Sequence, residues 1–236
     1  SPDGLASKRP FRRPHHTVSP AGMLGGGNPP MPGEVTMAHR GVLYLDEFCE
    51  FPPHVIESLR GPMEDGFITV SRSHGRVSFP SQFMLIASAN PCPCGYLGDP
   101  ERACVCQGAS LMRYRRRLAG PVIDRIDIQV EVPRVRRTDL ERPIAFLTSS
   151  SVRVEIEHAR ARQSERFCRK GFTNSAMGPR NIERVTLLGP PARRLLLDAV
   201  DQMALSARAY HRLIKVSRTI ADLDGAESVE EGHVLE

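Results

Sequence analysis

The sequence lacks a long apolar run and a recognisable signal peptide. No apolar run approaches the roughly 20 residues that a membrane-spanning helix needs, so we expect no membrane partner. The missing signal peptide predicts a cytoplasmic protein. A cytoplasmic location in turn argues against a disulfide framework for the six cysteines.

The composition is that of a globular protein. The 236 residues are 40% hydrophobic and 25% charged, which fits one large domain or two small ones. The net charge of +5 and the pI near 9.1 are compatible with a polyanionic partner without establishing one. The chain begins with Ser1 and stops at "GHVLE" without a turn or cap, so we expect a piece of a longer protein.

Two adjacent acids follow the apolar run in "GVLYLDE", residues 41–47. A run without polar alternation, here Val42–Leu45, predicts a strand buried on both faces of a parallel sheet. Ligands of open α/β sheets bind at the carboxyl ends of such strands. Asp46 and Glu47 would repel one another there unless a cation lay beside them, so the pair indicates a Mg²⁺ and phosphate site. The alternative is a strand that ends in a solvated turn.

The remaining pattern predicts an α/β fold, residues 1–133, followed by a linker over 134–150 and a small all-α domain over 151–236. In the first part we expect a helix over 53–64, a hairpin in "FITVSRSHGRVSF", a buried strand in "FMLIASAN", a loop over 91–108, a helix over 110–119 and a strand over 126–132. In the second part we expect helices over 152–169, 191–203 and 206–223 and a start near 228, with no strand.

Four of the six cysteines lie in the loop over 91–108. They form two C-x-C pairs that consist of Cys92, Cys94, Cys104 and Cys106. Four thiolates on one short loop could hold a tetrahedral Zn²⁺, although the usual spacing is C-x-x-C. The alternative is a loop with unliganded thiols.

Five stretches in this order resemble the AAA+ ATPases of the clade with a helix-2 insert, which includes the MCM helicases and the magnesium chelatase I subunits. The stretches are "RPFRRPHHTVSPAGMLGGG", "MAHRGVLYLDEF", "ASANPCPCG", "RYRRRLAGPVIDRID" and "LSARAYHRLIKVSRTIADLDG". Within that clade the sequence is most similar to the ComM/YifB group of magnesium chelatase-like proteins. The resemblance implies a partial AAA+ core followed by a helical lid.

The resemblance also implies a role for five side chains. Asp46 would support Mg²⁺ through water and Glu47 would polarise the attacking water. Asn90 matches the first sensor position, and Arg208 matches the sensor arginine of the lid. Arg125 matches the arginine finger, which would act on the nucleotide of the next subunit.

The assignments of Asn90 and Arg125 have simpler alternatives. Asn90 precedes Pro91 and could be a turn former. Arg125 could pair within the chain with Asp124 or Asp127. Two arginines that follow Arg208 on the same predicted helix, Arg212 and Arg218, are expected on its solvated face.

The phosphate-binding loop of this family, G-x-x-x-x-G-K-[ST], does not occur in the sequence. The glycine-rich run "GMLGGGNP" has no lysine after its last glycine, follows no strand and opens no helix, so we reject it as that loop. We therefore expect the loop upstream of Ser1, ATP and Mg²⁺ as cofactors of the complete protein, and no turnover by these residues alone.

Basic residues gather at the predicted hairpin tip and near the start of the chain. In the resembling motors this hairpin projects into a central pore, where basic groups suit a sugar-phosphate backbone. The predicted nucleic-acid-binding residues are Arg72, His74, Arg76, Arg12 and Arg13. A solvated basic face is the alternative, and the cluster from Arg113 to Arg117 could serve assembly instead.

The resemblance implies a hexameric ATP-driven motor that acts on single-stranded or branched DNA, as in branch migration during natural transformation or recombination. One alternative is a chelatase-type motor that drives metal insertion into a tetrapyrrole. Another is a truncated chain that only binds a partner.

Overall fold

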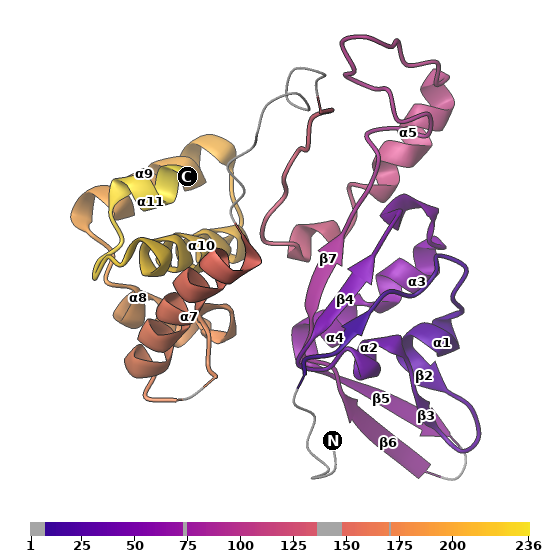
Figure 1. The fold of residues 1–236 in the computed structure, drawn as a ribbon, viewed down its shortest axis with the longest axis horizontal. Helices are drawn as coiled ribbons and strands as arrows, with labels where there is room; N and C mark the ends of the chain where they lie inside the picture. The colour runs from indigo at the N-terminus through magenta and orange to yellow at the C-terminus, as the bar shows by residue number, and fades with distance from the viewer. Residues whose placement is uncertain (1–7, 73–74, 136–147, 170) are drawn as a thin grey trace. The chain divides into compact units, whose positions relative to one another are not determined.

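The computed structural model describes residues 8–72, 75–135, 148–169 and 171–236 (Figure 1). Its contacts divide the chain between Arg134 and Val135 into two compact units, here the α/β unit and the helical unit. The predicted boundary after residue 133 lies beside this division. Most of the predicted linker over 134–150 lies outside the described residues. No helix in the described ranges is long and apolar enough to cross a membrane.

A three-stranded parallel sheet organises the α/β unit. Its strand order is β1 (Phe11–Arg12), β4 (Val42–Leu45) and β7 (Met84–Ala87). Both predicted strands are present and adjacent, with Leu43 of β4 in register with Leu85 of β7. The expected burial of the second strand is wrong, because Met84 and Ile86 of β7 are 54% and 43% exposed. Leu43 and Leu45 are fully buried, as an apolar central strand requires. The α/β fold class is confirmed.

The other elements of this unit are short. In chain order they are α1 (Pro20–Leu24), β2 (Gly25–Gly26), β3 (Met31–Pro32), α2 (Glu34–Met37), η1 (Phe48–Glu50), α3 (Pro53–Ser58), α4 (Arg60–Asp65), β5 (Phe67–Arg72), β6 (Gly75–Pro80), α5 (Gly108–Arg117) and η2 (Ile123–Arg125). Strands β2 and β3 form an antiparallel pair, as do β5 and β6. The predicted hairpin is thus β5–β6.

The helix expected over 53–64 is divided into α3 and α4 at Leu59. Pro62 explains the division, because a proline ring clashes with the carbonyl four residues earlier, here that of Ser58, and offers no N–H to it. The chain resumes helical hydrogen bonding where the Met63 N–H donates to the Leu59 carbonyl over 3.0 Å.

The strand expected over 126–132 is wrong. These residues form no ladder with any described strand, and β7 ends the sheet on that side. Its alternating apolar side chains Ile128, Val130 and Val132 are 66%, 75% and 84% exposed. Alternating apolar and polar residues indicate a half-buried strand only where a neighbouring strand pairs with their backbone N–H and C=O groups.

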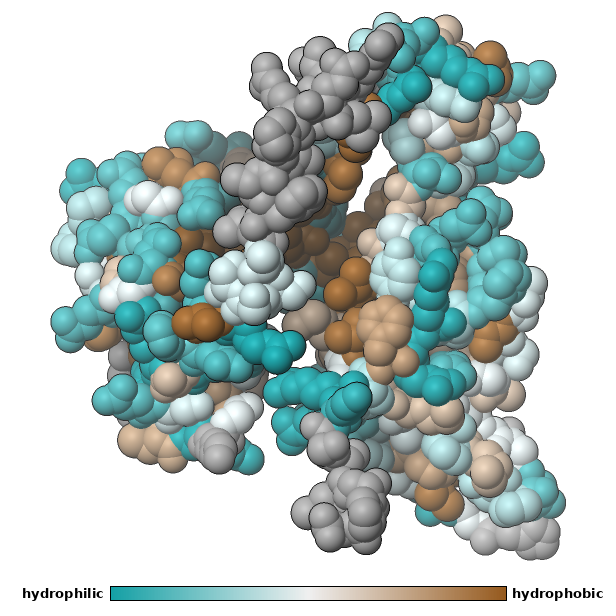
Figure 2. All heavy atoms as spheres, viewed as in Figure 1, coloured by the Kyte–Doolittle hydropathy of each residue, from teal (hydrophilic) through white to brown (hydrophobic). Residues whose placement is uncertain are grey.

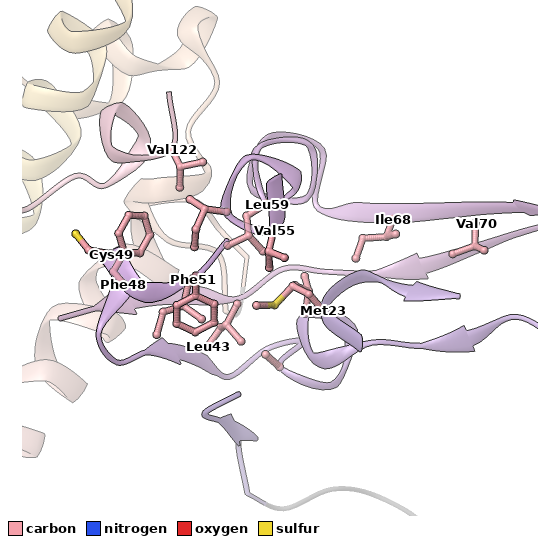
Figure 3. Packing of buried hydrophobic residues seen from close by; sticks show 14 of the residues in the cluster. Met23, Leu43, Phe48, Cys49, Phe51, Val55, Leu59, Ile68, Val70 and Val122 are labelled. Carbon is pink, nitrogen blue, oxygen red and sulfur yellow. The ribbon is translucent and has the colours of Figure 1, made fainter. Parts of the chain in front are cut away.

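One apolar cluster fills the α/β unit (Figure 3). It extends from Phe48 and Val122 at one end to Ile68 and Val70 of the hairpin at the other. The segment that follows the two acids therefore anchors them, since Phe48 is 2% exposed.

The helical unit contains α7 (Ser149–Arg166), η3 (Asn174–Ala176), α8 (Pro179–Thr186), α9 (Pro190–Met203), α10 (Ala207–Asp224) and α11 (Glu231–Leu235). Four of these six elements were predicted within a few residues, whereas η3 and α8 were missed. Ile182 of α8 packs with Leu196 and Ile214 in the core of this unit. Its visible outer surface is mainly hydrophilic (Figure 2). The only pairing of extended chain in the described part of the unit is an isolated bridge between Leu188 and Val229.

Candidate functional site

Asp46 lies at the carboxyl end of β4, where its side chain accepts hydrogen bonds from three residues. Its Oδ1 accepts hydrogen bonds from the Ser88 hydroxyl at 2.5 Å and from the Tyr44 hydroxyl at 3.2 Å. Its Oδ2 accepts a hydrogen bond from the guanidinium of Arg13. The Ser88 hydroxyl, helped by Arg13 and Tyr44 and opposed by desolvation, lowers the pKa of Asp46 below its ordinary value. The carboxylate is therefore ionised and oriented at neutral pH.

Glu47 follows in a different environment. Its backbone is left-handed, with φ 54° and ψ 48°, which is uncommon for a residue other than glycine. The side chain is 58% exposed, and its Oε2 lies 3.7 Å from Nδ1 of His16. One acid of the pair is thus fixed by hydroxyl groups, and the other remains accessible to solvent.

Ser88 is a site residue that the sequence analysis missed. It follows β7, where its N–H donates to the Leu45 carbonyl at 3.0 Å and its own carbonyl accepts from the Phe48 N–H at 2.8 Å. These two bonds place its hydroxyl against Asp46 and within 3.4 Å of the Glu47 N–H. The sequence could have indicated this role, because Ser88 is the first polar residue after the apolar run of the second predicted strand.

Replacing Ser88 by alanine should raise the pKa of Asp46, because the hydroxyl contributes most to its depression. NMR titration of the Asp46 carboxyl carbon in the present chain measures the shift. Ser78→Ala is the matched control, since the Ser78 hydroxyl contacts Thr69 in the hairpin. An unchanged pKa of Asp46 in Ser88→Ala would show that Arg13 and Tyr44, and not Ser88, lower it.

Asn90 lies three residues beyond the end of β7 and is exposed. Its carbonyl oxygen accepts a hydrogen bond from the Tyr114 hydroxyl of α5 at 3.0 Å. The contact fixes the backbone at this position. The sensor role of the amide stays a prediction.

The predicted DNA-binding residues are in different situations. Arg12 donates two hydrogen bonds to Glu34, at 2.6 and 2.7 Å, and Arg13 binds Asp46, so both groups are engaged with carboxylates of their own chain. Arg76 is exposed on β6 of the hairpin. The side chain of Arg72, whose backbone ends β5, and the whole of His74 lie outside the described part of the chain.

Arg125 is bound within the chain, but to neither of the partners that the sequence offered. Its side chain is 7% exposed, and Nε donates to Oε1 of Glu64 at 2.8 Å. A second nitrogen donates to the Pro121 carbonyl. Glu64 belongs to α4, 61 residues earlier, so local spacing could not have identified this pair.

Arg208 is exposed in the first turn of α10, in the helical unit. Ser206 is the N-cap of this helix, because its hydroxyl accepts from the Ala209 N–H at 3.2 Å. The expectation that Arg218 lies on the solvated face is wrong. Arg218 is fully buried and ion-paired to Asp222 at 3.0 Å, because it shares a helix face with Ile214 and Ala221.

The loop between β7 and α5 gathers its four cysteines. The sulfur atoms of Cys92, Cys94, Cys104 and Cys106 all lie within 4.8 Å of one another. Three pairs are closer still: Cys92 and Cys94 at 3.4 Å, Cys94 and Cys104 at 3.6 Å, and Cys92 and Cys104 at 3.7 Å. All six cysteines of the chain carry free thiols.

The thiols of this cluster differ in pKa. Backbone N–H groups of Tyr96 and Val105 lower the pKa of the Cys94 thiol to about 6, whereas desolvation raises that of Cys106 to about 12. Thiolates this close repel one another unless a cation neutralises them. The donor set and its spacing therefore fit a thiolate-binding metal such as Zn²⁺, whose Zn–S bonds of about 2.3 Å give S–S separations of about 3.8 Å in a tetrahedron.

Two family comparisons cover nearly the whole chain. Residues 1–140 match the family "Magnesium chelatase, subunit ChlI", and residues 147–236 match "Magnesium chelatase, subunit ChlI C-terminal". The first match ends close to the division between the two units.

Individual relatives agree with these matches. The chain is 41% identical over 231 residues to the competence protein ComM of Haemophilus influenzae and 37% identical over 231 residues to YifB of Escherichia coli. Each alignment covers 97% of this chain and 44% of the relative, so the chain spans less than half the length of these proteins. The chloroplastic magnesium-chelatase subunit ChlI of Oryza sativa is 38% identical over 60 residues, which are 25% of this chain and 14% of the relative.

Proposed function

The chain belongs to the magnesium chelatase subunit ChlI family, and from that premise we propose that it is part of an ATP-hydrolysing AAA+ ring motor that acts on DNA. One observation carries the proposal. Asp46 and Glu47 follow a parallel strand, and Ser88, which follows the adjacent strand, fixes the first acid while the second stays accessible. This is the arrangement that positions a metal-bound phosphate and the water that attacks it.

The residues around Asp46 fit Mg²⁺, which prefers carboxylate and hydroxyl oxygens and usually keeps several waters. Bound there, Mg²⁺ would neutralise charge on the phosphates. Asp46 would hold it through water, after release of its Oδ2 from Arg13. Glu47 would orient the attacking water and Asn90 would contact it or the phosphate.

Two further roles concern nucleotide binding. The chain contains no G-x-x-x-x-G-K-[ST] run, so the phosphate-binding loop would come from the part of the protein outside these 236 residues. Arg208 would serve as the sensor of the lid, and Arg125, once released from Glu64, would reach the nucleotide of a neighbouring subunit in a hexamer.

The exposed arginine of the hairpin supports DNA as the substrate. A guanidinium on an exposed β-ribbon suits a phosphate backbone, which is bound without reading sequence. We propose single-stranded or branched DNA as the substrate, in transformation or recombination, and the 41% identity to the competence protein ComM supports this proposal.

Removing Arg76 should weaken binding of single-stranded DNA by the present chain. If Arg76 contacts one phosphate, the slope of log affinity against log salt should fall by about one unit in Arg76→Ala. Fluorescence anisotropy with a labelled oligonucleotide over a salt series measures it. Arg153→Ala, which removes an exposed arginine of α7, is the matched control. Equal slopes in the two variants would remove the hairpin from the DNA interface.

The family name favours a second candidate, a motor that drives metal insertion into a tetrapyrrole through a partner subunit. Both candidates use the same ATPase residues. Stimulation of ATP turnover by DNA, measured in a protein of the length of the relatives, separates them, since a chelatase motor has no reason to respond to DNA. Absence of turnover in that longer protein would leave the third candidate, a chain that only binds a partner.

The cysteine cluster adds a third cofactor to this proposal. We assign to it one structural Zn²⁺ per chain, bound by Cys92, Cys94, Cys104 and Cys106.

A further inference from the structure

The cysteine loop has a second feature, a pair of carboxylates between its two C-x-C pairs. Asp99 is 10% exposed at its side chain, and its Oδ1 accepts from the N–H groups of Glu101 at 2.8 Å and Arg102 at 3.0 Å. These local bonds fix its orientation and leave Oδ2 available to another partner.

That partner is Arg134. Its Nη1 lies 3.4 Å from Oδ2 of Asp99 and 3.1 Å from Oε2 of Glu101. Arg134 is the last residue of the α/β unit before the chain continues into the helical unit. The cysteine loop therefore contacts the chain where the two units are joined.

The segment that ends at Arg134 is irregular. Residues 126–135 contain no helix or strand, and Ile128, Val130 and Val132 are mostly exposed. The loop itself projects beyond α5, away from β7 (Figure 1). The contact of Arg134 with Asp99 and Glu101 thus joins two irregular segments that are far apart in sequence.

We propose that Zn²⁺ on the four cysteines makes this loop a clamp for the connection between the two units. The metal would fix both ends of the span from Cys94 to Cys104, and Asp99 lies at its middle. With those ends fixed, Asp99 and Glu101 form a preorganised receptor for the Arg134 guanidinium. The inference rests on the zinc site proposed above and is independent of ATP turnover.

The physical reason is conformational entropy. An ion pair at a partly exposed site contributes too little free energy to order a loop of this length. Metal ligation supplies several times that free energy, since structural zinc binding is coupled to folding of the surrounding chain. We therefore expect zinc binding to order the loop, and we expect the contact between Arg134 and the loop to depend on bound zinc.

Trypsin provides a direct test in the present chain, because it must take the Arg134 side chain into its own pocket to cut after that residue. Metal analysis should find one zinc per chain in protein purified without chelators. Removal of zinc with a strong chelator should then accelerate cleavage after Arg134 by about 1.4- to 5-fold, the factor that an ion pair of this kind supplies. Cleavage after Arg169, an exposed arginine of the helical unit, is the internal reference in the mass spectra.

Variants separate the clamp from the metal. Asp99→Asn combined with Glu101→Gln keeps all four cysteines and the side-chain acceptor of the turn, so zinc should remain bound while cleavage after Arg134 accelerates even with zinc present. Glu131→Gln is the control, because it removes an exposed carboxylate from the same segment without touching the loop.

Three results would each overturn the inference. In the first, the purified protein contains no zinc. In the second, the rate of cleavage after Arg134 is the same with and without the chelator. In the third, the zinc-bound double variant is cleaved after Arg134 at the rate of the parent chain. The first would also remove the zinc site, whereas the other two would leave it standing and remove only the clamp.

Discussion

Replacing Asp222 by alanine is expected to lower the free energy of unfolding of the helical unit by about 3–5 kcal/mol. Asp222 and Arg218 are both fully buried. The Asp222 carboxylate binds Arg218 at 3.0 Å, Arg166 with both oxygens and the Asn174 amide at 2.8 Å. Its removal would leave a buried guanidinium without its charge partner, and such a loss rivals the whole stability of a small domain.

Urea unfolding followed by far-UV circular dichroism measures the change, since most of the described helix lies in this unit. Asp198→Ala, on the exposed side of α9, is the control and should stay within about 0.5 kcal/mol of the parent chain. A loss below about 1 kcal/mol in Asp222→Ala would mean that water reaches the cluster once the carboxylate is removed.

The same cluster predicts how the helical unit responds to acid. Burial alone would raise the pKa of Asp222, but hydrogen bonds from Arg166 and Asn174 and the charge of Arg218 outweigh it and hold the pKa below its ordinary value. A lowered folded-state pKa gives stability that is present above the ordinary carboxyl pKa and is lost as the pH falls through the lowered one. In Asp222→Ala the free energy of unfolding should no longer show the decrease at low pH that protonation of Asp222 causes.

Patterns of several consecutive residues predicted the fold well. The apolar runs predicted β4 and β7 as strands, and Leu43 and Leu45 of β4 are fully buried. The burial predicted for β7 was wrong, because Met84 and Ile86 remain exposed. The two C-x-C pairs came together as their clustering in one loop predicted. The positions of α7, α9 and α10 in the second unit were predicted from their helical pattern, whereas α8 was missed.

Features that depend on a distant partner could not be predicted. Arg125 binds Glu64, which lies 61 residues earlier, and the alternating run over 126–132 has no neighbour to make it a strand. The burial of Arg218 could have been predicted from the sequence, because its spacing of four residues from Ile214 and three from Ala221 places it on the buried face of the helix. Its charge misled the prediction, since buried arginines are rare without a partner.

In a protein of the length of the ComM and YifB relatives, Glu47→Gln should lower ATP turnover by about 10²- to 10⁴-fold and leave ATP binding intact. The amide keeps the size and hydrogen-bonding reach of the side chain but cannot accept a proton from water. Single-turnover hydrolysis and calorimetric ATP binding measure the two quantities separately. Glu50→Gln, three residues later on η1, is the control for loss of a nearby exposed carboxylate.

The backbone at Glu47 offers a way to separate catalysis from structure. A left-handed conformation costs an ordinary residue about 1–2 kcal/mol, a cost that glycine avoids. Strain of this kind persists where function requires it. Glu47→Gly should therefore be no less stable than the parent protein in urea unfolding and yet lose turnover as Glu47→Gln does. If either substitution left turnover near that of the parent protein, Glu47 would not orient the water, and the left-handed turn would need another explanation.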